Sequence, residues 1–230
     1  MNDPLTTPPT LSDRSGVTDA VRTQILATEH WSLLATRSMT WNEVFSRATM
    51  FITVLSAAVV ALALVAQVTA FGTGFRVFAL LVLPVVLIVG VATVIRLGDA
   101  NGEDFIYVLG MNRLRHAYME LAPELEPYFV TGYHDDEASI MQTYGQGNNI
   151  RLSRIIAGTP SLVAAINIVV AGVLAALIAA TLGAPDVTAV VIGTVAGLAA
   201  AAGFGALASR SIARTRRAYR ARFPRSHANA

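Results

Sequence analysis

Ala48–Phe75 reads ATMFITVLSAAVVALALVAQVTAFGTGF, and no residue in this stretch carries an ionisable side chain. Three further stretches share this property: Val77–Ile95, Ile155–Pro185 and Val187–Ser209. A helix needs about 20 mostly apolar residues to cross the ~30 Å hydrocarbon core of a bilayer, and each stretch meets or nearly meets that length. The sequence therefore predicts an all-α polytopic membrane protein, with four transmembrane helices in two hairpins and cytoplasmic helical extensions.

The composition supports a membrane protein and excludes several kinds of chemistry. Hydrophobic residues make up 54% of the 230 residues and charged residues only 14%, well below the usual quarter for a soluble domain. The absence of cysteine excludes disulfides, thiolate metal sites and cysteine nucleophiles. All seventeen basic residues are arginine, which excludes a lysine Schiff base and, with the heavy use of alanine, valine and glycine, is typical of a GC-rich bacterial genome.

The arginines predict the orientation of the spans. Four precede the first stretch, five lie between the second and third, and seven follow the fourth. Because positive residues near span ends stay in the cytoplasm, we expect both termini and the central loop to be cytoplasmic, in a bacterial inner membrane. The first 30 residues lack the apolar core of a cleavable signal peptide, so the first span is expected to act as an uncleaved anchor.

The chain divides by composition into six segments. We expect a disordered N-terminal tail (1–16), a cytoplasmic amphipathic helix (17–47), a transmembrane hairpin (48–96), a cytoplasmic helical loop (97–154), a second hairpin (155–209) and a basic cytoplasmic tail (210–230). Tight turns are predicted at 72–76 and 183–186. The second span is expected to continue as one helix almost to Pro123, followed by an irregular connector over 123–127 and a short helix over about 135–144.

An aromatic face precedes the first span and has two interpretations. Its residues recur at helical spacing: Trp31, Leu34, Ser38, Trp41 and Phe45. This face either lies in the lipid headgroup layer or packs on other cytoplasmic helices. Packing is favoured, because the nearby glutamates would be repelled by an anionic leaflet.

No cluster has the features of a metal, nucleotide or catalytic site. His134-Asp135-Asp136-Glu137 is the densest group of potential ligands, but consecutive helical residues point in different directions, and acidic residues are favoured where a helix begins. His116 and Glu120 form an ordinary i,i+4 pair. Gly145–Asn149 lacks the strand, lysine and hydroxyl of a phosphate-binding loop and is predicted to be a linker. We therefore expect no enzyme activity, metal or cofactor.

The spans contain a few uncharged polar residues, which are candidates for function. Ser56 and Gln67 lie in the first span, Thr93 in the second and Asn167 in the third. The absence of charge counts against a proton- or sodium-coupled transporter. An amide in lipid needs a partner, so these residues either join helices or line a water-filled pore.

Small residues and arginines mark the end of the chain. The run Gly193-x-x-x-Gly197-x-x-x-Ala201 predicts close helix packing, in a protein–protein interface. Arg210, Arg214 and Arg217 belong to the basic tail, which serves as a topological anchor and places these side chains near anionic lipid headgroups. Lipid is the nearest anion, so nucleic acid is not expected as a partner.

Two functions remain open at this point. The first is a homo-oligomeric channel or pore, with the small-residue helices or the Ser56/Gln67 face inside, because four packed helices leave no lumen of their own. The second is a non-conducting membrane-anchored scaffold or sensor whose cytoplasmic helices bind a partner. The sequence slightly favours the channel.

Overall fold

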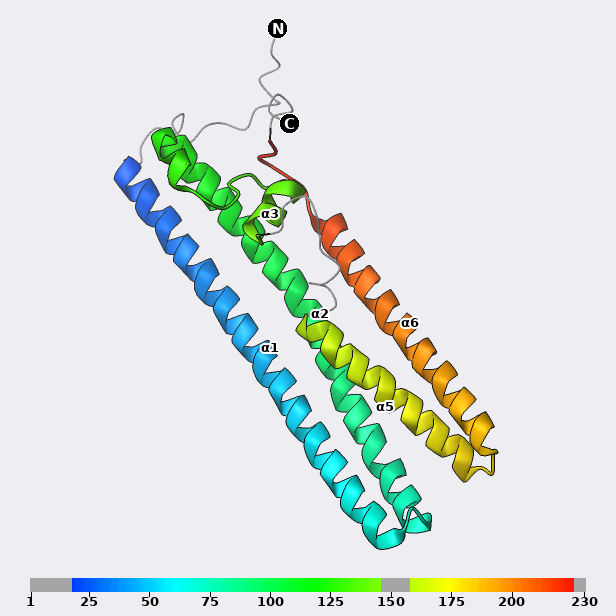
Figure 1. Ribbon diagram of the computed structural model, residues 1–230. Coiled ribbons are helices and arrows are strands. Elements are labelled where there is room, and N and C mark those ends of the chain that lie inside the picture. Colours follow the sequence, from blue (N-terminus) through cyan, green and yellow to red (C-terminus); the bar gives the residue numbers. More distant parts are fainter. Residues whose placement is uncertain (1–17, 146–157, 226–230) are drawn as a thin grey trace. The chain divides into compact units, whose positions relative to one another are not determined.

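The computed structural model describes residues 18–145 and 158–225, which are mostly helical, with no strand among them. Its elements are α1 (Asp19–Thr69), α2 (Thr73–Leu121), η2 (Pro123–Tyr128), α3 (Glu137–Thr143), α5 (Thr159–Thr181) and α6 (Asp186–Ala218) (Figure 1). Helices α1, α2, α5 and α6 are long and apolar enough to cross a membrane. The predicted all-α polytopic fold is confirmed.

The chain forms two compact units. Among the described residues, unit 1 comprises residues 18–40, 103–145 and 218–225, and unit 2 comprises residues 41–102 and 158–217. The boundaries fall inside α1 and α2 and near the end of α6. Each unit has its own cluster of buried apolar side chains.

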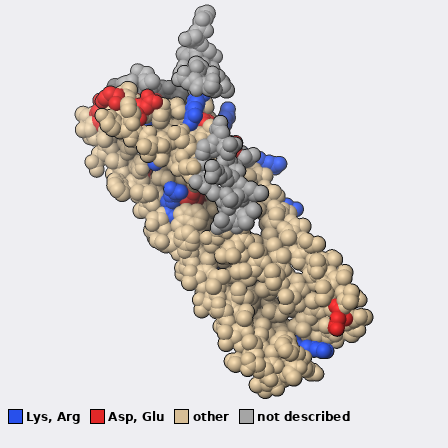
Figure 2. Space-filling model, in the orientation of Figure 1, with Lys and Arg blue, Asp and Glu red and all other residues tan. Residues whose placement is uncertain are grey.

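Unit 2 contains the predicted spans and packs through α1, α2 and α5. Its buried cluster includes Phe51, Val86, Leu97 and Val163. On the face shown in Figure 2, a broad surface of this unit carries no charged side chain. Charge appears where the uncharged stretches end, as at Glu43, whose carboxylate lies 2.8 Å from Arg47 and 2.9 Å from Arg96.

The two hairpins turn differently. In the first, α1 ends at Thr69, and Ala70 and Phe71 adopt positive φ angles of 44° and 59° before α2 begins at Thr73. In the second, Gly183 takes the positive φ of 92°, which glycine adopts without steric cost. The second turn, at 182–185, lies within one residue of the predicted 183–186. The first lies at 70–72 and not over the predicted 72–76, because residues 73–76 already belong to α2.

Unit 1 is built from the first part of α1, the last part of α2 and the segments that follow. Its apolar cluster consists of Val108, Met111 and Ile140. The predicted single helix up to Pro123 is confirmed, and the short helix is α3. The prediction of an irregular connector is wrong, because Pro123–Tyr128 forms a 3₁₀ turn in which the N–H of Phe129 donates to the carbonyl of Glu126. The predicted tail 1–16 and residues 146–149 of the linker lie outside the described residues.

The favoured interpretation of the aromatic face, packing on other helices, is wrong for the helices of this chain. Trp31, Leu34 and Phe45 are 70%, 40% and 49% exposed, although Trp41 is half-buried. In unit 1, α1 turns a different face inward, because Arg37 on that face binds the buried Asp104 at 2.6 Å.

Candidate functional site

A line of uncharged polar side chains runs along the exposed face of α1 in unit 2. We call it the polar seam; its members are Asn42, Ser46, Thr49, Thr53, Ser56 and Gln67, with Val60 and Ala63 completing the spacing. Every one of these eight positions is exposed. The steps of three and four residues keep them on one face of the helix. The buried positions Val44, Phe51 and Ala58 lie on the opposite face.

The hydroxyls of the seam bond within their own helix. Thr49 donates to the carbonyl of Phe45 at 2.9 Å, and Thr53 donates to that of Thr49 at 3.0 Å. Ser56 donates to Ile52 at 2.8 Å. Each oxygen keeps acceptor capacity that points away from the helix. Ser56 and Gln67 were predicted as candidates, whereas Thr49 and Thr53 were not. Thr49 lies seven residues from both Asn42 and Ser56, and Thr53 lies seven residues from Ser46, so the spacing is visible in the sequence.

Asn167 lies away from the seam, in the interior of unit 2. Its side chain is fully buried against Gly90 of α2, and its amide nitrogen donates to the carbonyl of Val163 at 2.8 Å. The amide oxygen has no hydrogen-bond partner in the structure. Asn167 was predicted either to join helices or to line a pore. The structure shows its amide at a contact between α5 and α2.

The small residues of α6 pack on α5 of the same chain. A Cβ on Gly193 would lie 2.7 Å from the carbonyl oxygen of Gly172, and one on Gly172 would lie 2.9 Å from that of Gly193. Gly197 also faces α5, where its Cβ would meet the carbonyl of Ile168 at 3.5 Å. Ala201, the third member of the run, is half-buried. Gly193 and Gly197 thus join two spans within one protomer.

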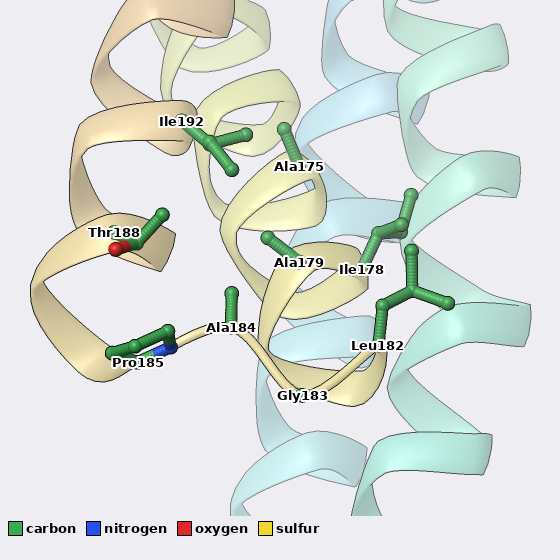
Figure 3. Close-up of a pocket in the computed structure, with 9 residues that line it drawn as sticks. All are labelled: Ala175, Ile178, Ala179, Leu182, Gly183, Ala184, Pro185, Thr188 and Ile192. Carbon is green, nitrogen blue, oxygen red and sulfur yellow. The ribbon is translucent and has the colours of Figure 1, made fainter.

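Two apolar cavities flank these spans. One, of about 650 Å³, lies beside the second turn, and its lining includes Ala175 and Ala179 of α5 and Thr188 and Ile192 of α6 (Figure 3). The other, of about 560 Å³, is lined by apolar side chains of α2, α5 and α6 and by Arg210. The lining of both cavities is mostly apolar. Arg214 and Arg217 lie exposed farther along α6.

Unit 1 contains a different arrangement, centred on the buried carboxylate of Asp135. Arg113 of α2 donates to it through Nε at 2.9 Å. The backbone N–H groups of Arg222 and Phe223 each donate to it at 2.8 Å. Three donors thus surround a carboxylate with no exposed surface, which is how a buried charge is tolerated.

Neighbouring polar groups of unit 1 are satisfied in the same way. Asn112 is fully buried, donates to the carbonyl of His134 and accepts from Arg115 and Thr143, each at 2.9 Å. Asp104 accepts from Arg37 and, at 2.7 Å, from the hydroxyl of Tyr144. Burial and the adjacent carboxylate raise the pKa of Tyr144, so this hydroxyl stays protonated and donates.

The helix-start interpretation of His134–Glu137 is confirmed for one residue. Asp136 caps α3, and its carboxylate accepts from the N–H of Ser139 at 2.9 Å. No group of three potential metal ligands comes together among residues 18–145 and 158–225. His116 lies 3.7 Å from Glu120, and its ring stacks on Phe223 with 4.6 Å between centroids. Burial lowers the pKa of His116.

Comparisons with known proteins add no assignment. No family model matches this chain, and neither a curated protein nor a solved structure matches it.

Proposed function

We propose that the protein is a homo-oligomeric channel of the bacterial inner membrane, in which α1 of each copy turns its polar seam toward a shared aqueous lumen. Both termini lie in the cytoplasm, as the distribution of arginines predicts. The observation that supports this proposal is the exposed seam itself: Thr49, Thr53, Ser56 and Gln67 all lie within the uncharged stretch and on one face.

The other candidate linings are already used inside the protomer. Asn167 is buried against Gly90, and Gly193 and Gly197 pack on α5. The seam differs from them because it faces outward from a single chain. Lipid gives Gln67 no hydrogen-bond partner, and an unpaired polar group costs roughly 1–3 kcal/mol. A water-filled lumen removes this cost, which favours assembly with the seam inside.

The chemistry of the seam predicts the kind of conduction. Hydroxyl and amide oxygens offer lone pairs to hydrated ions, but the seam carries no formal charge from Thr49 to Gln67. Rings of charged side chains are what separate cations from anions in many channels. We therefore expect K⁺ and Cl⁻ to pass at comparable rates.

Thiol modification tests the lumen directly, because the chain has no native cysteine. In liposomes containing Ser56→Cys, a membrane-impermeant charged thiol reagent should label the cysteine and block efflux of K⁺ and Cl⁻. The matched control is Thr194→Cys, since Thr194 is also exposed and bonds to the carbonyl of Val190 at 2.9 Å. This variant should conduct and be unaffected by the reagent.

Three outcomes would contradict the proposal. They are a monomeric particle in detergent by light scattering, efflux no faster than from empty liposomes, and equal block of the Ser56→Cys and Thr194→Cys variants.

Gln67→Leu should reduce efflux at unchanged particle mass.

A membrane-anchored scaffold or sensor is the second candidate. It is favoured by unit 1, where Asp104, Asn112 and Asp135 are buried and bonded to segments far apart in sequence. Such buried networks specify one conformation. A folded, non-conducting monomer would favour this function over the channel.

A further inference from the structure

The segment that follows α6 lies across a surface of unit 1. This tail segment, Tyr219–Arg225, contacts α2, α3 and the residues just before α3. Its residues alternate between half-buried and exposed up to Pro224. It is therefore held in the manner of a bound peptide, with one side against the surface.

The surface recognises the backbone of the tail segment. The carboxylate of Asp135 accepts from the N–H groups of Arg222 and Phe223, and the N–H of Asp135 donates to the carbonyl of Phe223 at 3.3 Å. Nδ1 of His134 lies 3.2 Å from that same carbonyl. Arg113 donates to the carbonyl of Arg220 at 3.1 Å. Such contacts hold a peptide backbone whatever its side chains are.

Two side chains add sequence preference. The ring of Phe223 stacks on His116. Two residues later, the guanidinium of Arg225 donates to the hydroxyl of Ser139 at 2.9 Å and to the side-chain oxygen of Gln142 at 2.8 Å. Arg220 and Arg222 bind through their backbone instead: the carbonyl of Arg220 accepts from Arg113, and the N–H of Arg222 donates to Asp135.

We propose that this surface is a peptide-recognition site for a segment with an aromatic residue and an arginine two positions later, and that the chain's own tail segment is its releasable ligand. Release of the tail segment does not leave the carboxylate of Asp135 unpaired, because Arg113 of α2 remains its partner. Besides backbone hydrogen bonds, the tail segment supplies the rings of Tyr219 and Phe223 and the guanidinium of Arg225. Tyr219 packs against the cluster of Val108, Met111 and Ile140, so release uncovers one side of that cluster.

Peptide binding tests the proposal. A fluorescent peptide of residues 218–230 is titrated, in neutral detergent, into the full chain and into a chain that ends at Arg217. We expect saturable binding to the shortened chain and at least about tenfold weaker binding to the full chain, whose site is occupied. A peptide with Phe223→Ala and Arg225→Ala should bind the shortened chain at least about tenfold more weakly, a loss of roughly 1.4 kcal/mol. A scrambled peptide of equal charge is the control.

Equal binding to both chains, or equal binding of the scrambled peptide, would overturn the proposal. If the shortened chain does not fold, trypsin gives the answer on the full chain. The Phe223→Ala, Arg225→Ala double variant should then be cleaved after Arg220 or Arg222 at least about tenfold faster than wild type, and an unchanged rate would overturn the proposal. Neither readout depends on conduction, so failure here and failure of the channel are separate results.

Discussion

Among the described residues of unit 2, the buried polar side chains are Thr93 and Asn167, and each bonds to a carbonyl of its own helix. In unit 1 they include Asp104, Asn112 and Asp135, which bond to segments between 22 and 88 residues away. The difference reflects what each unit must bury. Span helices can satisfy their polar groups internally, whereas unit 1 uses charge to join pieces that are distant in sequence. We therefore expect a substitution at a buried polar residue of unit 1 to destabilise several segments, and one in unit 2 to affect a single helix contact.

Replacing the central carboxylate of unit 1 should have the largest effect. Asp135→Asn removes the charge that Arg113 and two backbone N–H groups share. Breaking a buried pair of this kind costs about 3–5 kcal/mol. Hydrogen exchange measured by mass spectrometry should therefore rise in α3 and in the tail segment, with little change in α5. Glu124→Gln, at an exposed position, is the control and should leave exchange unchanged. An equal rise in both units would contradict the contrast drawn here.

A glycine contact provides the corresponding test in unit 2. A Cβ on Gly90 would overlap the amide of Asn167, which is held by its bond to Val163. Gly90→Ala should cost about 1–3 kcal/mol of stability, as overpacking typically does. Gly98→Ala is the matched control in the same helix, because no atom lies within 4 Å of the added Cβ; it should be neutral or stabilising by up to about 1 kcal/mol.

The double variant Gly90→Ala, Asn167→Ala shows whether the cost arises at this contact. It should be more stable than the sum of the single effects predicts, since the second change removes the overlapping amide. The free energy of unfolding is compared by thermal unfolding in detergent for wild type, Gly90→Ala, Asn167→Ala and the double variant. Strict additivity would mean that Gly90 and Asn167 do not meet in the folded chain.

The spans could be predicted because a stretch without charge leaves a chain few alternatives. The uninterrupted α2 up to Leu121 followed from helical spacing and from Pro123. The role of Asp135 could not be predicted, because its partners Arg222 and Phe223 are 87 and 88 positions away and no local pattern links them. Asp136 was predictable as a cap because a cap acts on the next few residues. The inward face of α1 in unit 1 was missed, since aromatic side chains signal burial more strongly than an arginine does.

Acidification should have the smallest effect on stability, and it should again affect unit 1 but not unit 2. Burial, with Arg115 nearby, lowers the pKa of His30, and burial lowers that of His116 despite the opposing carboxylates of Glu120 and Asp135. His134 also faces His116 and lowers its pKa. Below the ordinary histidine value of 6.5, the unfolded unit therefore binds more protons than the folded unit.

The stability contributed by these neutral histidines is complete above about pH 6.5 and is lost as the pH falls through their folded pKa values. Hydrogen exchange in unit 1 should accelerate between about pH 7 and pH 5, after correction for the intrinsic pH dependence of exchange. Exchange in the spans of unit 2 should not, because those stretches contain no ionisable side chain. The variant His30→Gln, His116→Gln should flatten the response of unit 1. If its response instead equals that of wild type, other groups carry the pH dependence and the buried histidines do not distinguish the units.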